Sequence, residues 1–129
     1  MSEAPASRRS GRHLAAFALL ELARNGSLHG LGLQRVINDL LPDALQVDAG
    51  NLYRVLREME GRDAVSSSWD TSASGPARRM YAITPAGRRE LKSWAEDIRQ
   101  RRAAFDTFLE QCEQLDSDAS GPAKERTHG

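Results

Sequence analysis

The stretch DAGNLYRVLREM, residues 48–59, decides how the rest of the chain is organised. Its apolar residues recur at steps of three and four, as in an amphipathic helix docked on a core; they are Leu52, Val55, Leu56 and Met59. The opposite flank carries donors that can meet phosphates or base edges in a major groove; they are Asn51, Tyr53, Arg54 and Arg57. Asp48 can cap this helix, and Gly50 in the first turn lets a DNA backbone approach closely. An ordinary half-buried helix with a solvated basic face would show the same pattern. The neighbouring segments are therefore needed to distinguish it from a recognition helix.

Two helices are predicted before this stretch. Apolar residues over 13–24 support the first, which Asn25-Gly26 ends. After a short connector at 27–30, residues 31–41 form the second helix, with Arg35 facing outward, and Pro42 stops it. Together with residues 48–59, these segments have helix-turn-helix order.

A β-hairpin is predicted after the third helix. Residues 64–70 and 78–84 read as strands, and a polar turn that contains Gly75 joins them. Arg78 and Arg79 lie at the base of the second strand, where basic side chains can follow a phosphate backbone. The hairpin is therefore interpreted as a wing, although a hairpin that only seals the edge of a small core would look much the same.

The longest helix of the chain begins at Thr84-Pro85, a strong helix start. From 91 to 115 its residues step alternately by three and four in a heptad seam. The apolar seam positions are Leu91, Trp94, Ile98, Phe105, Phe108, Cys112 and Leu115. Such a stripe needs a second chain to cover it, so we predict a homodimer made chiefly by this helix. Alternatively the helix folds back on its own domain, which could cover its first half but hardly residues 105–115.

Composition limits the function further. The chain has 129 residues, 40% apolar and 28% charged, and its net charge is zero, which fits one soluble globular domain with tails. Residues 1–92 hold 13 Lys and Arg against 10 Asp and Glu, whereas residues 93–129 hold 5 against 8. The net positive charge of residues 1–92 would allow one face of the protein to bind a polyanion. The longest apolar run, residues 14–23, is too short to span a bilayer, so no membrane partner is expected.

No enzyme, cofactor or metal site is expected. His13, His29 and His128 are scattered without metal-ligand spacing, and no phosphate-cradling glycine motif occurs. The only cysteine, Cys112, excludes an intramolecular disulfide and fits a reducing, cytoplasmic location. Cys112 reads as a small core residue of the seam, and a thiol sensor is the open alternative.

The predicted fold class is mostly α with a small β-hairpin (α+β). It comprises a winged helix-turn-helix DNA-binding domain over 13–84 and a C-terminal dimerisation helix over 85–115. Residues 1–12 and 116–129 have the composition of disordered tails.

Residues 13–115 resemble the PadR family of winged-helix transcriptional regulators. Three motifs carry the resemblance: LHGLGLQRVI at 28–37, DAGNLYRVLREMEGRDAV at 48–65 and GPARRMYAITPAGRREL at 75–91. The resemblance implies DNA contacts in the recognition segment and the wing, from Gly50, Asn51, Tyr53, Arg57, Gly75, Arg78 and Arg79. It also implies dimers formed through the C-terminal helix. Some members bind small aromatic effectors between the subunits, for which Trp94 is the candidate contact.

Departures from the family pattern fall at positions where DNA contacts are expected. Asn51 replaces the usual Thr, Arg54 the common Pro, and Met80 the first Tyr of the wing. Each of these residues is compatible with a helix or strand at its position, so the expected fold is unchanged. The operator sequence that is familiar from the family therefore cannot be carried over to this chain. The expected function is a DNA-binding repressor, a homodimer on a pseudo-palindromic double-stranded operator, released by a small effector. A protein-interaction module that uses the winged helix without specific DNA binding is the alternative.

Overall fold

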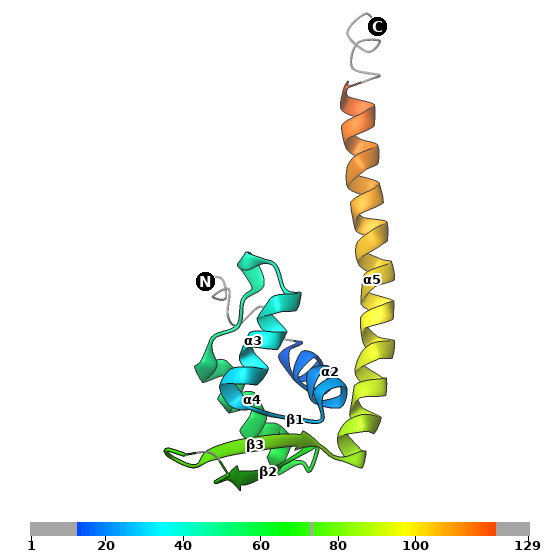
Figure 1. Ribbon diagram of the computed structural model, residues 1–129. Helices are drawn as coiled ribbons and strands as arrows, with labels where there is room; N and C mark the ends of the chain where they lie inside the picture. The colour runs from blue at the N-terminus through cyan, green and yellow to red at the C-terminus, as the bar shows by residue number, and fades with distance from the viewer. Residues whose placement is uncertain (1–12, 73, 121–129) are drawn as a thin grey trace, which may run out of the picture. The chain divides into compact units, whose positions relative to one another are not determined.

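A computed structural model of the chain describes residues 13–72 and 74–120 (Figure 1). In chain order the elements are α2 (Leu14–Asn25), β1 (Ser27–His29), α3 (Gly30–Leu40), the 3-10 turn η1 (Asp43–Leu45), α4 (Ala49–Gly61), β2 (Val65–Asp70), β3 (Arg78–Ile83) and α5 (Pro85–Ser120). The chain divides into two compact units, one ending at Trp94 and the other beginning at Ala95. This order confirms the predicted winged helix-turn-helix followed by a long C-terminal helix.

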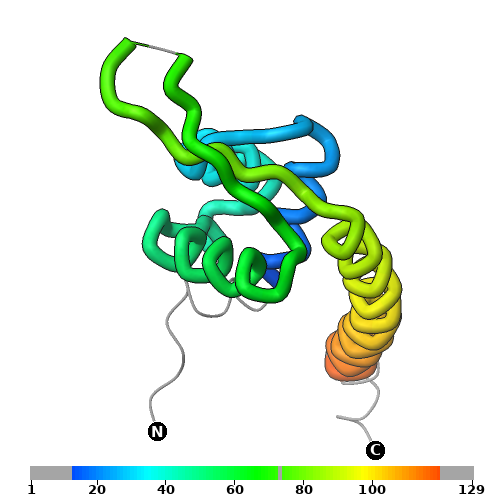
Figure 2. Tube along the Cα trace, turned by 90° about the horizontal axis from the view of Figure 1, so that it is seen from below, coloured from blue at the N-terminus to red at the C-terminus, as the bar shows by residue number. Residues whose placement is uncertain are grey.

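The sheet has three antiparallel strands in the order β1-β3-β2, so β3 is central. The β2–β3 hairpin projects beyond the helices of the first unit (Figure 2). Residues 27–29 were predicted as a connector, and that prediction is wrong, because Leu28 pairs with Tyr81 and His29 with Met80. Three residues are too few to show an alternating pattern, so this strand depends on the β3 edge that it meets.

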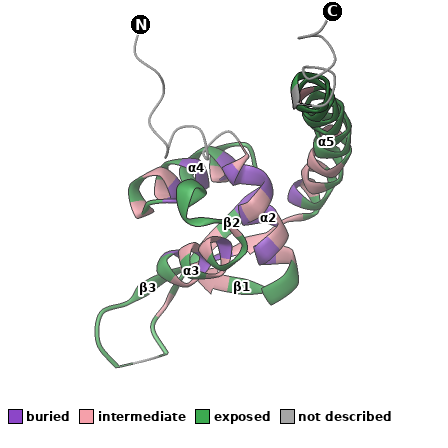
Figure 3. Ribbon diagram, turned by 90° about the horizontal axis from the view of Figure 1, so that it is seen from above, coloured by how far each residue is buried: buried purple, intermediate pink, exposed green. Residues whose placement is uncertain are grey.

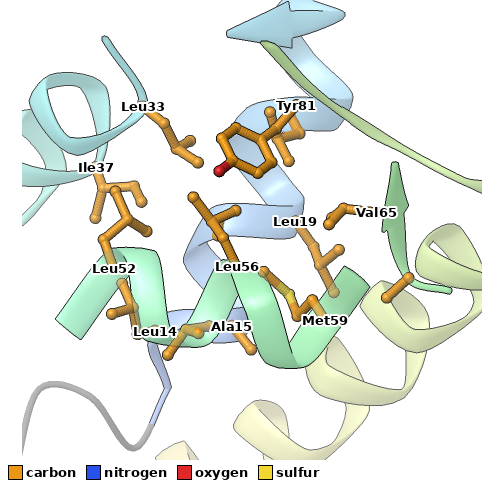
Figure 4. Packing of buried hydrophobic residues seen from close by; sticks show 14 of the residues in the cluster. Leu14, Ala15, Leu19, Leu33, Ile37, Leu52, Leu56, Met59, Val65 and Tyr81 are labelled. Carbon is orange, nitrogen blue, oxygen red and sulfur yellow. The ribbon is translucent and has the colours of Figure 1, made fainter. Parts of the chain in front are cut away.

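The core of the first unit lies where α2, α3 and α4 meet the sheet (Figure 4). Leu52, Leu56 and Met59 of α4 are fully buried, as the three-and-four spacing predicted. They pack with Leu14 and Leu19 of α2, Leu33 and Ile37 of α3, Val65 of β2 and Tyr81 of β3. Burying each such leucine contributes about 1.5–3 kcal/mol, so α4 is held by one face and leaves the other free for function.

Two predicted helix caps are present. The Asp48 carboxylate accepts a hydrogen bond from the backbone N–H of Asn51 at 2.7 Å, and the Thr84 hydroxyl oxygen accepts one from Gly87 N–H at 2.9 Å. These bonds satisfy N–H groups that a helix start leaves without a partner. They therefore set the first turns of α4 and α5.

Helix α5 is longer than predicted, because it continues past Leu115 to Ser120. Residues 116–120, predicted as part of a tail, are therefore helical, whereas residues 1–12 and 121–129 lie outside the described residues. Figure 3 shows buried positions concentrated on α2 and α4, while most of α5 is exposed. None of the described helices is long and apolar enough to cross a membrane.

Candidate nucleic-acid interface

Helix α4 separates its buried and solvent-facing residues as expected for a recognition helix. Arg54 and Arg57 are exposed, and Asn51 and Tyr53 are half-buried. Arg57 makes no hydrogen bond or ion pair with any residue that the structure describes. Its five N–H donors are therefore available for a ligand such as a base edge or a phosphate.

Arg54 and Asn51 form a ladder along the exposed face of α4. Arg54 Nη1 donates to Glu58 Oε2 at 3.1 Å and Nη2 donates to Asn51 Oδ1 at 3.4 Å. Asn51 Nδ2 donates in turn to Asp48 Oδ2 at 3.4 Å. Exposed helix pairs of this kind contribute only about 0.3–0.5 kcal/mol each. The ladder therefore orients both donors and can be exchanged for contacts to DNA at small cost.

Tyr53 lies across the start of α3. A Cβ atom placed on Gly30 would come within 2.4 Å of Tyr53 Cε1, because the ring packs directly over this buried glycine. The tyrosine position on α4 therefore depends on the absence of a side chain on α3. No such role for Gly30 was predicted from the sequence.

Arg78 and Arg79 differ in their contacts, although the sequence predicted the same role for both. They are neighbours on a strand, so their side chains point to opposite faces of the sheet. Arg79 Nε donates to Ser67 Oγ at 3.0 Å, its Nη2 lies 3.7 Å from Glu60 Oε2, and its guanidinium lies 5.2 Å from the Trp69 ring centroid. These contacts hold Arg79 between the hairpin and the end of α4.

Arg78, by contrast, is exposed and has no hydrogen bond or ion pair with the described residues. It pairs in register with Asp70 across the hairpin. Of the two arginines, Arg78 is thus the one whose charge is available at the surface.

A cavity of about 220 Å³ lies between the start of α3, helix α4 and strand β3. It is lined by His29, Gly30, Leu31, Tyr53, Arg78 and Arg79. The fold thereby brings Tyr53 of the recognition helix together with both wing arginines. The other predicted DNA-binding residues do not line this cavity; they are Arg35, Gly50, Asn51, Arg54, Arg57 and Gly75.

His29 joins the start of α3 to the hairpin, since its Nε2 lies 3.2 Å from Asp70 Oδ2. The pKa of Asp70 is lowered, first by the hydroxyl and backbone N–H of Ser72 and further by His29. The sequence placed His29 only in a short connector. A contact between residues 41 positions apart leaves no local pattern that could have revealed it.

The remaining predicted DNA-binding positions lie on the surface. Arg35 of α3 and Gly50 of α4 are exposed. Gly75 lies in the hairpin turn with φ at +98°, a left-handed conformation that suits glycine. Their contacts to DNA remain predictions.

The predicted dimer seam of α5 divides into two groups. Leu91 and Trp94 are half-buried and pack against the core of the first unit. Trp94 Nε1 donates to Glu90 Oε2 at 3.1 Å, and its ring makes an edge contact with His13. In the second unit the larger apolar side chains are exposed: Ile98 37%, Phe105 61%, Phe108 64%, Leu109 54% and Leu115 69%, while Cys112 is half-buried.

An ion pair ties the end of α4 to the first turns of α5. Arg62 Nε donates to Glu90 Oε1 at 2.9 Å and Nη2 donates to Oε2 at 2.6 Å. This bidentate contact lowers the pKa of Glu90 and raises that of Arg62. Within the described residues no group of three or more His, Cys, Asp or Glu side chains could hold a metal ion.

The sequence profile of the transcriptional regulator PadR-like family matches residues 19–93, more than half of the chain. This range contains α3, α4, the hairpin and the start of α5. The chain belongs to the PadR-like family of transcriptional regulators. This confirms the predicted family and the prediction that the protein is not an enzyme.

Several solved structures share the fold of this chain. A conserved protein of unknown function and potential transcriptional factor, TM0937, is 28% identical, with a TM-score of 0.69 over 82% of this chain and 92% of that chain. A PadR-like transcriptional regulator from Bacillus cereus strain ATCC 14579 is 21% identical, with a TM-score of 0.63 over 75% and 91% of the two chains. A PadR family transcription regulator from Clostridium difficile R20291 is 18% identical, with a TM-score of 0.64 over 75% and 98%. No curated protein sequence was found to match the chain.

Proposed function

We propose that this PadR-like regulator is a cytoplasmic repressor that binds double-stranded DNA as a homodimer, at a pseudo-palindromic operator. The observation that carries the proposal is that two exposed arginines on neighbouring elements, Arg57 of α4 and Arg78 of the hairpin, form no hydrogen bond or ion pair with the described residues. A helix in the major groove and a basic hairpin along the backbone are the two contacts that a winged helix can make at once.

The residues divide between reading bases and holding phosphates. Asn51, Arg54 and Arg57 face outward on α4 and would read base edges in the major groove. Arg78 would bind phosphate from the wing, and Arg35 from α3. Tyr53 would support the reading of bases, Gly50 and Gly75 would let the DNA backbone approach closely, and Arg79 would hold the hairpin against α4.

Fluorescence anisotropy tests the proposal. The protein is titrated onto labelled DNA from upstream of its own gene and onto scrambled DNA, at several salt concentrations. We expect preferential, steeply salt-dependent binding to the native fragment, because phosphate contacts release counterions. Arg57→Ala should cost about 1–3 kcal/mol and relax the preference, whereas the matched control Arg99→Ala, on exposed helix α5, should bind as wild type. Equal, weak, salt-insensitive binding to both fragments would refute DNA recognition and favour the protein-interaction module.

Control by a small effector is the second part of the proposal. Trp94 is the candidate contact, because its half-buried ring lies near the start of the predicted dimer helix. An aromatic effector between the subunits would release DNA only by binding one arrangement of the dimer better than the other. Titration of small planar compounds onto the DNA complex tests this: a compound that quenches tryptophan fluorescence in the wild type and releases DNA should do neither after Trp94→Phe.

A further inference from the structure

The guanidinium of Arg54 is held from two sides by side chains of its own helix. Its Nη1 donates to Glu58 Oε2 at 3.1 Å, and its Nη2 donates to Asn51 Oδ1 at 3.4 Å. The Asn51 amide is oriented in turn, because its Nδ2 donates to the Asp48 carboxylate. Arginine has five N–H donors, so these two bonds leave three donors of Arg54 for a ligand. Arg54 is therefore fixed in place while most of its hydrogen-bonding capacity is free.

Glu58 has Arg54 as its side-chain partner although a second arginine lies equally near in the sequence. Arg62 follows Glu58 by four residues, but its guanidinium is bonded to the Glu90 carboxylate at 2.9 and 2.6 Å. Arg57, the other exposed arginine of α4, makes no ion pair with any described residue. The exposed face of α4 thus carries one arginine that is free and one that a carboxylate holds.

The stability of α4 does not explain a glutamate at position 58. The side chains of Arg54 and Glu58 are 49% and 55% exposed, so water and salt screen their attraction. A cation that precedes its anion by four residues is also the less favourable order in a helix. Moreover, Glu58 lies in the last turn of α4, where the helix dipole disfavours negative charge. A role that depends on its contact with Arg54 explains this residue better.

A held arginine and a free arginine would recognise DNA in different ways. A free guanidinium can bind any phosphate within reach, and phosphate contacts carry no sequence information. The carboxylate of Glu58 keeps Arg54 from doing so, because it restrains the guanidinium and repels phosphates nearby. In the major groove, guanine presents two adjacent acceptors, N7 and O6, that match two N–H groups of the guanidinium. Adenine presents an N6 donor in place of O6 and would oppose one of these groups.

We propose that Glu58 determines specificity by positioning Arg54 for a bidentate contact with one guanine in each half-site of the operator. Glu58 is a positioning residue, since it acts on the base only through Arg54. Asn51 supports the guanidinium from the other side and keeps one N–H and one lone pair for a neighbouring base. The proline that is common at position 54 in the family could donate none of these bonds. The inference rests on the proposed DNA-binding function and specifies one base that the helix reads.

Selection of binding sites from a randomised double-stranded DNA library tests the inference without a known operator. The full chain and its variants Arg54→Lys and Glu58→Ala each select a motif, which is then titrated with all four base pairs at each position. The wild type should prefer a G·C pair at one position of each half-site. Arg54→Lys keeps the charge but lacks the planar fork, so it should lose this preference. Glu58→Ala should lower the preference for guanine at the same position about tenfold.

Affinity for scrambled DNA separates positioning from a merely structural role. Glu58→Ala should bind scrambled DNA about threefold more tightly, and its slope of log affinity against log salt should steepen by about one, because Arg54 is then free to bind a phosphate. The matched control Glu96→Ala removes the same charge from an exposed pair with Arg99 on α5, at 2.9 Å, and should behave as wild type.

The outcomes that overturn the inference differ from those that overturn the proposed function. If Glu58→Ala keeps the guanine preference of the wild type, or loses affinity for every sequence alike, Glu58 does not position Arg54 for a base. A wild-type motif in which Arg54→Lys changes no G·C preference also overturns the inference. A wild type that selects no motif at all would instead refute sequence-specific DNA binding, and this inference with it.

Discussion

At Gly87, helix α5 lies close to Ala64 and Ile83, and replacement of this glycine by alanine tests how α5 is anchored. A Cβ atom at Gly87 would lie 2.1 Å from the carbonyl oxygen of Ala64 and 2.8 Å from Ile83 Cγ1. Ordinary contact needs about 3.5 Å, so the helix or the chain at Ala64 must move by more than about 1 Å. The obstacle is backbone rather than the end of a flexible side chain.

The expected cost follows from three contributions. Overpacking costs about 1–3 kcal/mol, here at the upper end because a carbonyl group cannot rotate away. The same carbonyl accepts the Thr84 N–H at 3.1 Å, and weakening that bond adds about 1 kcal/mol. The higher helix propensity of alanine offsets about 0.5–1 kcal/mol of this destabilisation. We expect Gly87→Ala to lower the free energy of unfolding by about 2–3 kcal/mol, a large share of the roughly 5–15 kcal/mol typical of a domain.

Urea denaturation followed by circular dichroism measures this loss. Gly61→Ala is the matched control, because Gly61 ends α4 and a Cβ there would meet nothing within 4 Å. We expect the control to match the wild type or to gain up to about 0.5–1 kcal/mol. If Gly87→Ala unfolds within 0.5 kcal/mol of the wild type, as a rough limit of surface substitutions, the close approach of α5 to Ala64 does not exist in solution.

Three further outcomes are expected. Arg78→Ala should reduce the slope of log affinity against log salt for DNA binding by about one while Arg78→Lys keeps it, and an unchanged slope in the alanine variant would exclude a phosphate contact. Gly30→Ala should push the Tyr53 ring aside and weaken DNA binding more than Tyr53→Phe does, with similar melting temperatures; equal affinities would contradict a positioning role for Gly30. The hydrogen bond from Arg62 lowers the pKa of Glu90 in the folded chain. The ion pair therefore stabilises the fold at pH values above the pKa that Glu90 has in the unfolded chain. This stabilisation is lost as the pH falls through the pKa of Glu90 in the folded chain. Glu90→Gln should therefore be about 0.5–1 kcal/mol less stable than the wild type at pH 7, and the difference should shrink as the pH is lowered through the pKa of Glu90 in the folded chain; a difference that stays constant as the pH falls would refute the assignment.

The recognition helix shows how far the sequence could lead. The spacing of Leu52, Leu56 and Met59 identified the buried face of α4, and Asp48 identified its start. Arg54 and Arg57 were placed on the exposed face by the same periodicity. These features are local, because a helix of 3.6 residues per turn fixes which residues share a face whatever lies around it.

The wing shows where local reasoning stops. The hairpin was predicted from its two strands, but the third strand, β1, was not, because Ser27, Leu28 and His29 become a strand only by pairing with β3. Arg78 and Arg79 were equivalent in the sequence. Their difference depends on Glu60 and Ser67, which belong to other elements and hold Arg79 alone.

The sequence by itself determined the order of the elements, their caps and faces, the family, and the length of apolar seam on α5. Only the tertiary structure decided which distant residues meet: Tyr53 over Gly30, Gly87 against Ala64, and His29 beside Asp70. The physical reason is the range of the interactions. Periodicity and capping act within about one helical turn and so appear in any short window of sequence, whereas these contacts join residues separated by 23 to 41 positions and exist only once the helices and the sheet have packed.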